Sequence, residues 1–206
     1  MYLNVRRYRG VAGDKTLIEQ SVRSELLPEL ERHGCEGYLA FWTEDGGGVS
    51  VSIFAGVEDA QRSTDAVRRW ILRHQHSFPE RFEEFSGECF SQESANGERQ
   101  GPGAARQPLY VLIRTLVSVP RTQDTRAFVE QRTLPMITRS PGFRGVYMLW
   151  DDREEGRAAV VTLFEKQEQA ETSHAKALQL LKEGLPAARV ERVLQGQSVV
   201  RYAGRA

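Results

Sequence analysis

The sequence predicts an α+β fold in which two tandem ferredoxin-like repeats, each ordered β-α-β-β-α-β, form an intramolecular α/β barrel with antiparallel sheets. The first observation behind this prediction is internal self-similarity: SVSIFAGVEDAQRS at residues 50–63 returns as VVTLFEKQEQAETS at residues 160–173. A shift of 108 residues also aligns YLNVR with YVLIR and GCEGYLAFW with GFRGVYMLW. The second observation is that both copies show the same succession of strand-like and helix-like periods, so one unit is written twice.

Each repeat is expected to begin with a strand followed by a helix. Alternating apolar residues indicate first strands around Leu3 and Ile113. After the first of these, Ile18, Val22 and Leu26 recur every four residues, which indicates one face of a helix. Pro28 and Pro135 stand at the same place in the two predicted helices. Because proline in a helix interior costs about 3 kcal/mol, we expect a shared kink or a new final turn there.

Two further strands, a helix and a fourth strand complete each repeat. A hairpin joins the second and third strands, which end at Trp42 and Phe54 in one copy and at Trp150 and Phe164 in the other. Fourth strands are expected around residues 81–90 and 192–202.

These elements place repeat 1 at residues 1–90 and repeat 2 at residues 109–206. The intervening residues 91–108 are rich in Gly, Pro, Ser and Gln, which is the composition of a flexible linker. A unit of about 90 residues is marginally stable alone. Because the second strands are apolar on both faces, each repeat is expected to bury its second face on the other.

The composition is that of an ordinary soluble protein, and a cytoplasmic location is expected. The chain has 28 basic and 28 acidic residues, so no net field favours nucleic acid or an anionic membrane. No apolar run approaches the roughly 20 residues that cross a bilayer. Cys35 and Cys89 form no C-x-x-C pair, and His74 and His76 have no neighbouring carboxylate cluster, so neither a disulfide framework nor a metal site is expected.

The run SPGFRG at residues 140–145, followed by a strand, a hairpin and VVTLFEKQEQAETS, resembles the antibiotic biosynthesis monooxygenase family of dimeric α/β barrels. Repeat 1 follows the same pattern, with His33 in place of Pro141 and Cys35 in place of Phe143. The resemblance covers nearly the whole chain apart from the linker. It implies a tandem version, in which two fused copies replace a homodimer, and a superfamily of cofactor-free oxygenases, haem-degrading enzymes and small isomerases.

The haem-degrading branch of this superfamily uses an Asn on the first strand and a Trp and a His on the second helix. Asn4 matches the first of these positions. Ungapped counting places Ser63 and Ser173 at the Trp position, and Arg73 and Glu183 at the His position. The resemblance therefore implies a protein without a cofactor, with haem as the less favoured alternative.

Arg6 and Arg114 recur at one strand position in the two copies. A guanidinium inside a barrel could hold a phenolate or carboxylate ligand. A structural ion pair is an equally good interpretation. Because burying an unpaired arginine is costly, each is expected to have a partner.

The remaining candidates also have structural interpretations. Asn4 could hold oxygen or a substrate carbonyl through its amide, although a contact at an edge or a turn is preferred. His174 could be a general base or an axial haem ligand, or lie at the surface. Trp42 and Trp150 recur and are expected mainly in the core, with stacking on a substrate as the minor role. A pocket between the sheet and the helices is expected to contain Asn4, Arg6, Tyr38 and His174.

The family resemblance implies a cofactor-independent monooxygenase that oxidises an aromatic or polycyclic phenol or quinol. The catalytic candidates are Asn4 and His174, and the substrate-binding candidates are Arg6, Tyr38, Trp42, Arg114 and Trp150. The alternatives are a non-catalytic ligand-binding or structural barrel and, third, a haem-binding barrel. The expected partner is a small aromatic molecule, and further dimerisation is left open. Because Leu112 replaces Asn4 and His174 replaces Thr64, a site is expected in one half or in two unequal halves.

Overall fold

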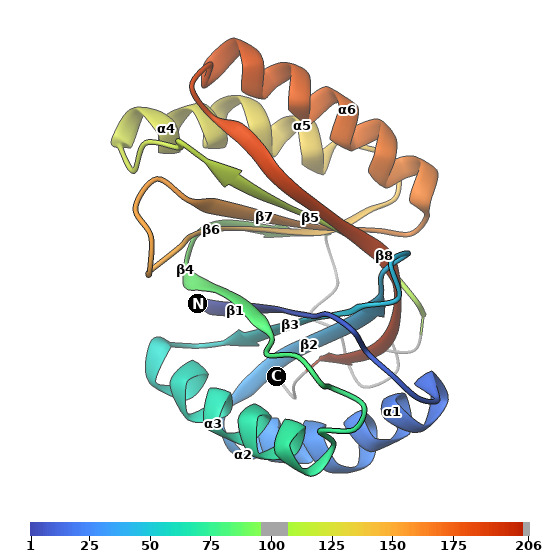
Figure 1. Ribbon diagram of the computed structural model, residues 1–206. Coiled ribbons are helices and arrows are strands. Elements are labelled where there is room, and N and C mark those ends of the chain that lie inside the picture. Colours follow the sequence, from blue (N-terminus) through green and yellow to red (C-terminus); the bar gives the residue numbers. More distant parts are fainter. Residues whose placement is uncertain (96–106, 204–206) are drawn as a thin grey trace. The chain divides into compact units, whose positions relative to one another are not determined.

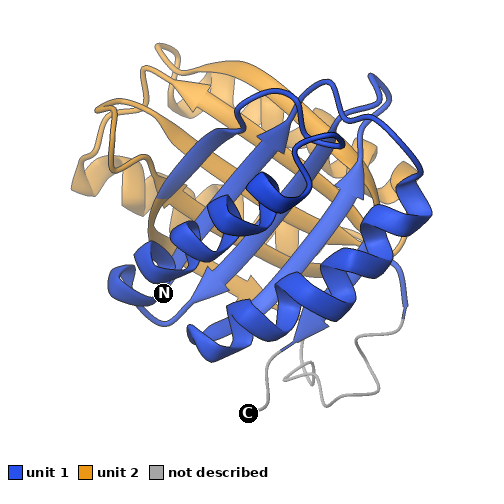
Figure 2. Ribbon diagram, turned by 60° about the horizontal axis from the view of Figure 1, so that its bottom comes forward, with its two compact units in different colours: residues 1–86, 99–108, 198–206 blue, residues 87–98, 109–197 orange. Residues whose placement is uncertain are grey.

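The computed structural model describes residues 1–95 and 107–203, which fall into two compact units (Figures 1 and 2). Among these residues, unit 1 comprises 1–86, 107–108 and 198–203, and unit 2 comprises 87–95 and 109–197. Most of the predicted linker, residues 96–106, lies outside the described part of the chain. The compact units therefore do not end where the sequence repeats end.

The elements of the two repeats follow the predicted order. The first repeat contains β1 (Tyr2–Tyr8), α1 (Lys15–Ser21), η1 (Val22–Leu26), α2 (Leu27–Arg32), β2 (Cys35–Trp42), β3 (Gly48–Phe54), α3 (Val57–Arg73) and β4 (Glu83–Ser94). The second contains β5 (Tyr110–Val117), α4 (Gln123–Phe128), η3 (Val129–Thr133), α5 (Leu134–Thr138), β6 (Phe143–Trp150), β7 (Ala158–Phe164), α6 (Gln167–Gly184) and β8 (Arg189–Ala203).

The described strands hydrogen-bond in the closed order of a barrel, β1-β3-β2-β8-β5-β7-β6-β4. Neighbouring strands are antiparallel, for example β1 with β3 and β5 with β7. The predicted α+β fold of two ferredoxin-like repeats with antiparallel sheets is thus confirmed. The fourth strands are longer than predicted, because β4 and β8 each continue from one unit into the other.

The repeated prolines follow a turn of π-helix in both copies. The N–H of Leu27 bonds to the carbonyl of Val22, and the N–H of Leu134 bonds to that of Val129, each five residues back. Pro28 and Pro135 then fall in the first turn of a new α-helical segment, where a missing N–H has no cost. This is the new final turn that the sequence indicated.

The glycine that ends the first helical region has the same conformation in both copies. Gly34 and Gly142 have φ values of 77° and 68°, in the left-handed region that favours glycine. A side chain at Gly142 would also overlap the amide of Gln169 at the start of α6. The paired G-x-x-G runs of the sequence therefore mark a turn that fixes the start of β2 and of β6.

In each unit, the helices lie across one face of the strands, as Figure 2 shows for unit 1. Buried apolar side chains fill the layer between them. In unit 1 these include Leu30, Tyr38, Phe54, Val67 and Trp70. In unit 2 they form two clusters that include Leu112, Ile137, Met148, Phe164, Leu116 and Trp150. The two recurring arginines project into this same layer.

Candidate functional site

Arg6 of unit 1 lies in a completed polar network. Its side chain is fully buried, and its Nε donates to Glu84 Oε1 at 2.8 Å. Nη2 donates to Thr64 Oγ1 at 2.8 Å and Nη1 to Ser52 Oγ at 3.4 Å. Because the Glu84 side chain is only 4% exposed, this is a buried ion pair. Arg6 thus has the partner that the sequence analysis expected.

Asn4 belongs to the same network. In the amide orientation that satisfies both ends of the side chain, Asn4 accepts a hydrogen bond from Arg6 Nη2 at 2.9 Å and donates to the Leu3 carbonyl at 3.3 Å. Its side chain is buried rather than placed at a strand edge. Asn4 and Arg6 are therefore tied to each other inside unit 1.

Arg114, the counterpart of Arg6 in unit 2, has lost each of these partners. A shift of 110 residues places Thr162 at the position of Ser52 and His174 at that of Thr64. A shift of 109 aligns EEFSGE at residues 83–88 with RVLQGQ at residues 192–197, which places Val193 at the position of Glu84. Val193 is indeed the residue opposite Arg114 on the neighbouring strand β8.

None of these replacements neutralises Arg114. Thr162 Oγ1 donates instead to the Leu112 carbonyl at 2.9 Å. Arg114 is 4% exposed, and its Nε and Nη1 have no hydrogen-bond partner among the described residues. Burial alone lowers the pKa of Arg114 to about 10, which leaves it charged at neutral pH. The expectation that each arginine would have a partner is wrong for Arg114.

His174 lies in the second turn of α6, beside this unpaired charge. Its Nδ1 is buried without a hydrogen-bond partner in the described chain. Burial lowers the pKa of His174 below its usual value of 6.5, and the charge of Arg114 lowers it further. A neutral imidazole next to a buried guanidinium can accept a proton from a ligand whose anion the guanidinium then stabilises.

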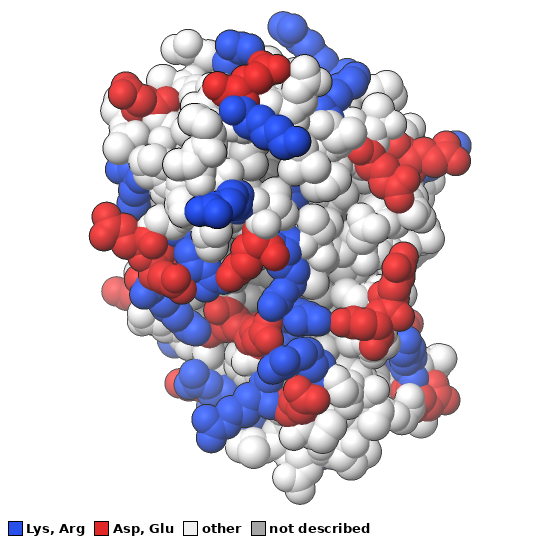
Figure 3. Space-filling view, turned by 45° about the horizontal axis from the view of Figure 1, so that its top comes forward, with Lys and Arg blue, Asp and Glu red and all other residues white. Residues whose placement is uncertain are grey.

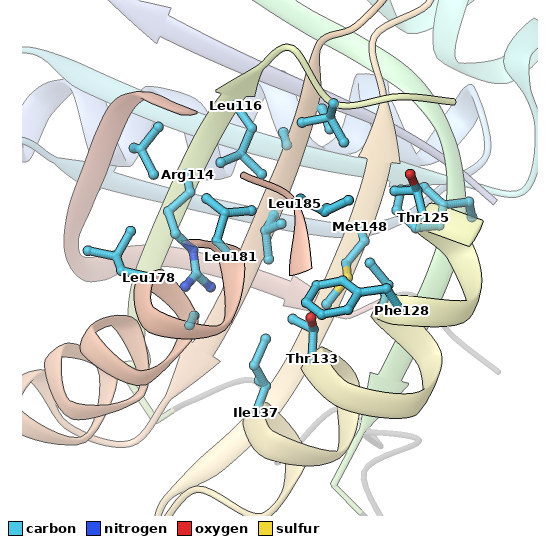
Figure 4. A pocket seen from close by; sticks show the side chains of 18 residues that line it. Arg114, Leu116, Thr125, Phe128, Thr133, Ile137, Met148, Leu178, Leu181 and Leu185 are labelled. Carbon is cyan, nitrogen blue, oxygen red and sulfur yellow. The ribbon is translucent and has the colours of Figure 1, made fainter. Parts of the chain in front are cut away.

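A cavity of about 60 Å³ opens beside Arg114 between the strands and helices of unit 2 (Figure 4). Figure 4 shows Arg114 reaching from β5 towards α6, with Phe128 and Met148 on the other side of the cavity. Arg114 is the only ionisable side chain among the described residues that line the cavity. The others are mostly apolar and include Phe90, Val129, Ile137, Leu178, Leu181 and Leu185.

Phe128 closes part of this cavity and is held by the end of α6. A side chain at Gly184, the last residue of that helix, would overlap the Phe128 ring. Phe128, Leu181 and Leu185 are all half-buried, so each has solvent on one side. Phe128, Leu181 and Leu185 therefore form a partly exposed section of the cavity wall.

Tyr38 and Trp42 line a separate cavity of about 40 Å³ in unit 1. Burial, and next the nearby Tyr8, raise the pKa of Tyr38 far above its usual value, so its hydroxyl stays protonated. Trp42 Nε1 donates to Glu19 Oε1 at 2.7 Å, and Lys15 Nζ lies 5.1 Å from its ring centroid. The polar groups of this cavity are thus engaged with one another.

Trp150 has a packing role in unit 2. Its ring stacks on that of Phe90, with centroids 4.5 Å apart and an interplanar angle of 18°. It is 2% exposed and belongs to the core cluster with Leu116 and Val119. Trp150 does not line the cavity directly; it supports Phe90, which does.

The structure therefore divides the predicted site residues between the two units. Unit 1 holds Asn4, Arg6, Tyr38 and Trp42, and unit 2 holds Arg114, Trp150 and His174. Arg114, Trp150 and His174 each have a buried polar atom without a partner in the described chain, and Arg114 and His174 interact with each other. The replacement of Glu84 in repeat 1 by Val193 in repeat 2 is missing from the sequence-based prediction, although the alignment of EEFSGE with RVLQGQ contains it.

Other classes of site find little support in the described residues. They contain no group of three His, Cys, Asp or Glu side chains placed to hold a metal ion. None of their helices has the length and apolar character to cross a membrane. On the face shown in Figure 3, basic and acidic side chains are interspersed, as the equal totals of 28 each would suggest.

Comparisons with known proteins give the fold. No family model matches the sequence, and no curated protein matches it. A protein of Fusobacterium nucleatum named "putative monooxygenase" has a solved structure that matches with a TM-score of 0.73 and 12% identity, covering 98% of this chain and 94% of that one.

Two further solved structures match over nearly the whole chain. An anthrone oxidase-like protein matches with a TM-score of 0.67 and 13% identity, covering 100% of this chain and 94% of its own. A variant chlorite dismutase of Candidatus Nitrospira defluvii matches with a TM-score of 0.58 and 9% identity, covering 96% and 91%. At such identities the likeness shows the fold alone: this chain has the α/β-barrel fold of proteins named as monooxygenases.

Proposed function

We propose that the cavity of unit 2 is the active site of a cofactor-independent monooxygenase that oxidises a phenol or quinol. The observation that carries this proposal is the buried, unpaired guanidinium of Arg114 in an apolar cavity, beside the neutral His174. We further propose that the chain is a tandem version of the antibiotic biosynthesis monooxygenase barrel. The internal repeat and the coverage of whole solved chains support that relationship.

The chemistry needs an electron-rich, ionised ring and protection from water. His174 Nδ1 would take the hydroxyl proton, and Arg114 would pair with the resulting anion. The ionised ring then reacts with dioxygen at a carbon that carries hydrogen. One oxygen atom becomes the new carbonyl oxygen, and the other leaves as water with the two hydrogens lost from the ring carbon and the hydroxyl. Dioxygen is the oxidant, and the product is a quinone.

The size of the cavity favours a small substrate. An engineered cavity of about 150 Å³ is known to bind benzene, whereas this one measures about 60 Å³. A single ring therefore enters only if Phe128, Leu181 or Leu185 turns aside, and a polycycle would require more of the wall to move. We accordingly propose a monocyclic phenol or quinol ahead of the polycyclic alternative.

The test is oxygen uptake by the purified protein with mono- and polycyclic phenols and quinols, corrected for autoxidation with heat-inactivated protein. We expect uptake with a monocyclic compound, and a loss of at least tenfold in Arg114→Gln and in His174→Gln. His76→Gln is the matched control, because His76 is exposed in unit 1. Uptake that survives both substitutions, or no uptake with any compound, would refute the proposal.

A non-catalytic binding protein is the second candidate, favoured by the same unpaired groups, because binding an anion needs no reaction. It predicts stabilisation by a ligand without oxygen uptake.

The haem-binding alternative fits poorly. The cavity is much smaller than a porphyrin, and the only histidine of unit 2, His174, has its Nδ1 buried. If the wild-type protein shows a Soret band on addition of haemin and His174→Ala does not, the haem-binding alternative would be supported.

A further inference from the structure

Glu84, the ion-pair partner of Arg6, indicates what kind of group Arg114 would bind. In unit 1, Glu84 Oε1 lies 2.8 Å from Arg6 Nε and 3.5 Å from Thr64 Oγ1. The side chains of both charged residues are almost completely buried. Glu84 therefore places a carboxylate at the Nε edge of the repeated arginine, within reach of the residue that His174 replaces.

The corresponding position in unit 2 holds no carboxylate. Val193 stands opposite Arg114 on β8 and is 38% exposed, so the region that a glutamate side chain would fill is open on one side. Arg114 Nε, the atom that Glu84 satisfies in unit 1, has no partner in the described chain. A carboxylate arriving from outside could therefore reach it.

We propose that the ligand of unit 2 carries a carboxylate that takes the place of the Glu84 carboxylate and binds Arg114 Nε, with its apolar body in the cavity. This names the substrate class as a monocyclic hydroxyaromatic acid, and for the hydroxyl group it rests on the proposed function. The ligand enters as a monoanion with its hydroxyl group still protonated, because Arg114 is the only ionisable group among the described lining residues. A second negative charge would form only when His174 takes the hydroxyl proton, and the resulting imidazolium and Arg114 Nη1 would then balance it.

Thermal unfolding with benzoate tests the carboxylate site without any oxidation. We expect benzoate to raise the unfolding midpoint of the wild-type protein. Benzamide, which has the same shape without the charge, should bind about tenfold more weakly or worse, because a hydrogen bond to a charged group is the stronger one. Terephthalate, with a second carboxylate, should also bind more weakly. Equal binding of benzoate and benzamide would overturn the proposal.

Val193→Glu and Val193→Gln form the matched pair of variants, since Val193 is partly exposed and either side chain can be accommodated. Val193→Glu should place an internal carboxylate on Arg114, unfold at a higher temperature than Val193→Gln, and lose the response to benzoate. Val193→Gln should keep that response. If benzoate stabilises Val193→Glu as much as the wild type, the proposed position is wrong.

The two proposals can fail separately. If benzoate behaves as expected but no hydroxyaromatic compound consumes oxygen, the carboxylate site stands and the oxygenase function fails. If phenols are oxidised but benzoate does not bind, the oxygenase function stands and the carboxylate site fails.

Discussion

The same substitution at the two equivalent arginines should have opposite effects on stability. Methionine keeps an unbranched apolar stem of similar length and removes the charge. In Arg6→Met, the Glu84 carboxylate remains buried without its cation. Breaking a buried pair in this way costs about 3–5 kcal/mol.

In Arg114→Met, no partner loses its counter-ion, and two unpaired buried nitrogens disappear. Each unsatisfied buried donor costs about 1–3 kcal/mol. The smaller methionine side chain also loses some packing contacts, which offsets part of this gain. We therefore expect a net stabilisation of about 1–3 kcal/mol. At about 2–4 °C per kcal/mol for a chain of this size, Arg6→Met should lower the unfolding midpoint by roughly 6–20 °C, and Arg114→Met should raise it by roughly 2–12 °C.

The measurement is thermal unfolding followed by circular dichroism at pH 7, in a buffer free of carboxylates, which would occupy the site. Urea unfolding of the same variants gives an independent check on the sign. If Arg114→Met destabilises the protein as much as Arg6→Met does, then Arg114 is compensated by contacts other than those described, and the argument for a vacant anion site fails.

Three further predictions concern the wall, the histidine and the repeated turn. Gly184→Ala should destabilise the protein by about 1–3 kcal/mol, because the new side chain overlaps Phe128. In a Phe128→Ala background, the same substitution should be neutral or stabilising. An equal loss of stability in both backgrounds would contradict the role of Phe128. Because the pKa of His174 is lowered in the folded state, its contribution to stability is complete above about pH 6.5 and is lost as the pH falls below that value. His174→Gln should therefore flatten urea-unfolding stability against pH on the acid side, and an unchanged profile would count against a neutral His174. Gly142→Ala should cost more than Gly156→Ala by calorimetry, because both have positive φ but only Gly142 meets a neighbouring side chain closely; equal losses would mean that backbone strain alone decides.

The sequence repeat was sufficient to predict the fold, since the paired Gly34/Gly142 and Pro28/Pro135 positions report local backbone conformation, which neighbouring residues largely determine. The exchange of strand ends between the units could not be predicted in the same way. It depends on pairing between distant segments such as Tyr38 and Tyr202, and no local pattern encodes that choice.

The site was only partly predictable for a related reason. The sequence indicated that Arg6 and Arg114 are equivalent and that His174 replaces Thr64. Whether each arginine is paired, however, depends on a residue far away in the chain. The similarity of EEFSGE to RVLQGQ is too weak to make the replacement of Glu84 by Val193 evident. Asn4 and His174 form one set of catalytic candidates in the sequence, but they lie in different units of the structure.

The long strand β8 has a consequence for how the chain folds during synthesis. Residues 198–203 pair with β2 in unit 1, so that Leu39 meets Arg201 and Gly37 meets Ala203 across more than 160 residues of sequence. Such long-range pairings form slowly, because a large loop must close before they form. Although its helices and first strands emerge first from the ribosome, unit 1 therefore keeps an open strand edge at β2 until unit 2 has been translated. We expect a nascent chain stalled before residue 198 to be protease-sensitive in unit 1 and prone to pair with other chains through that edge.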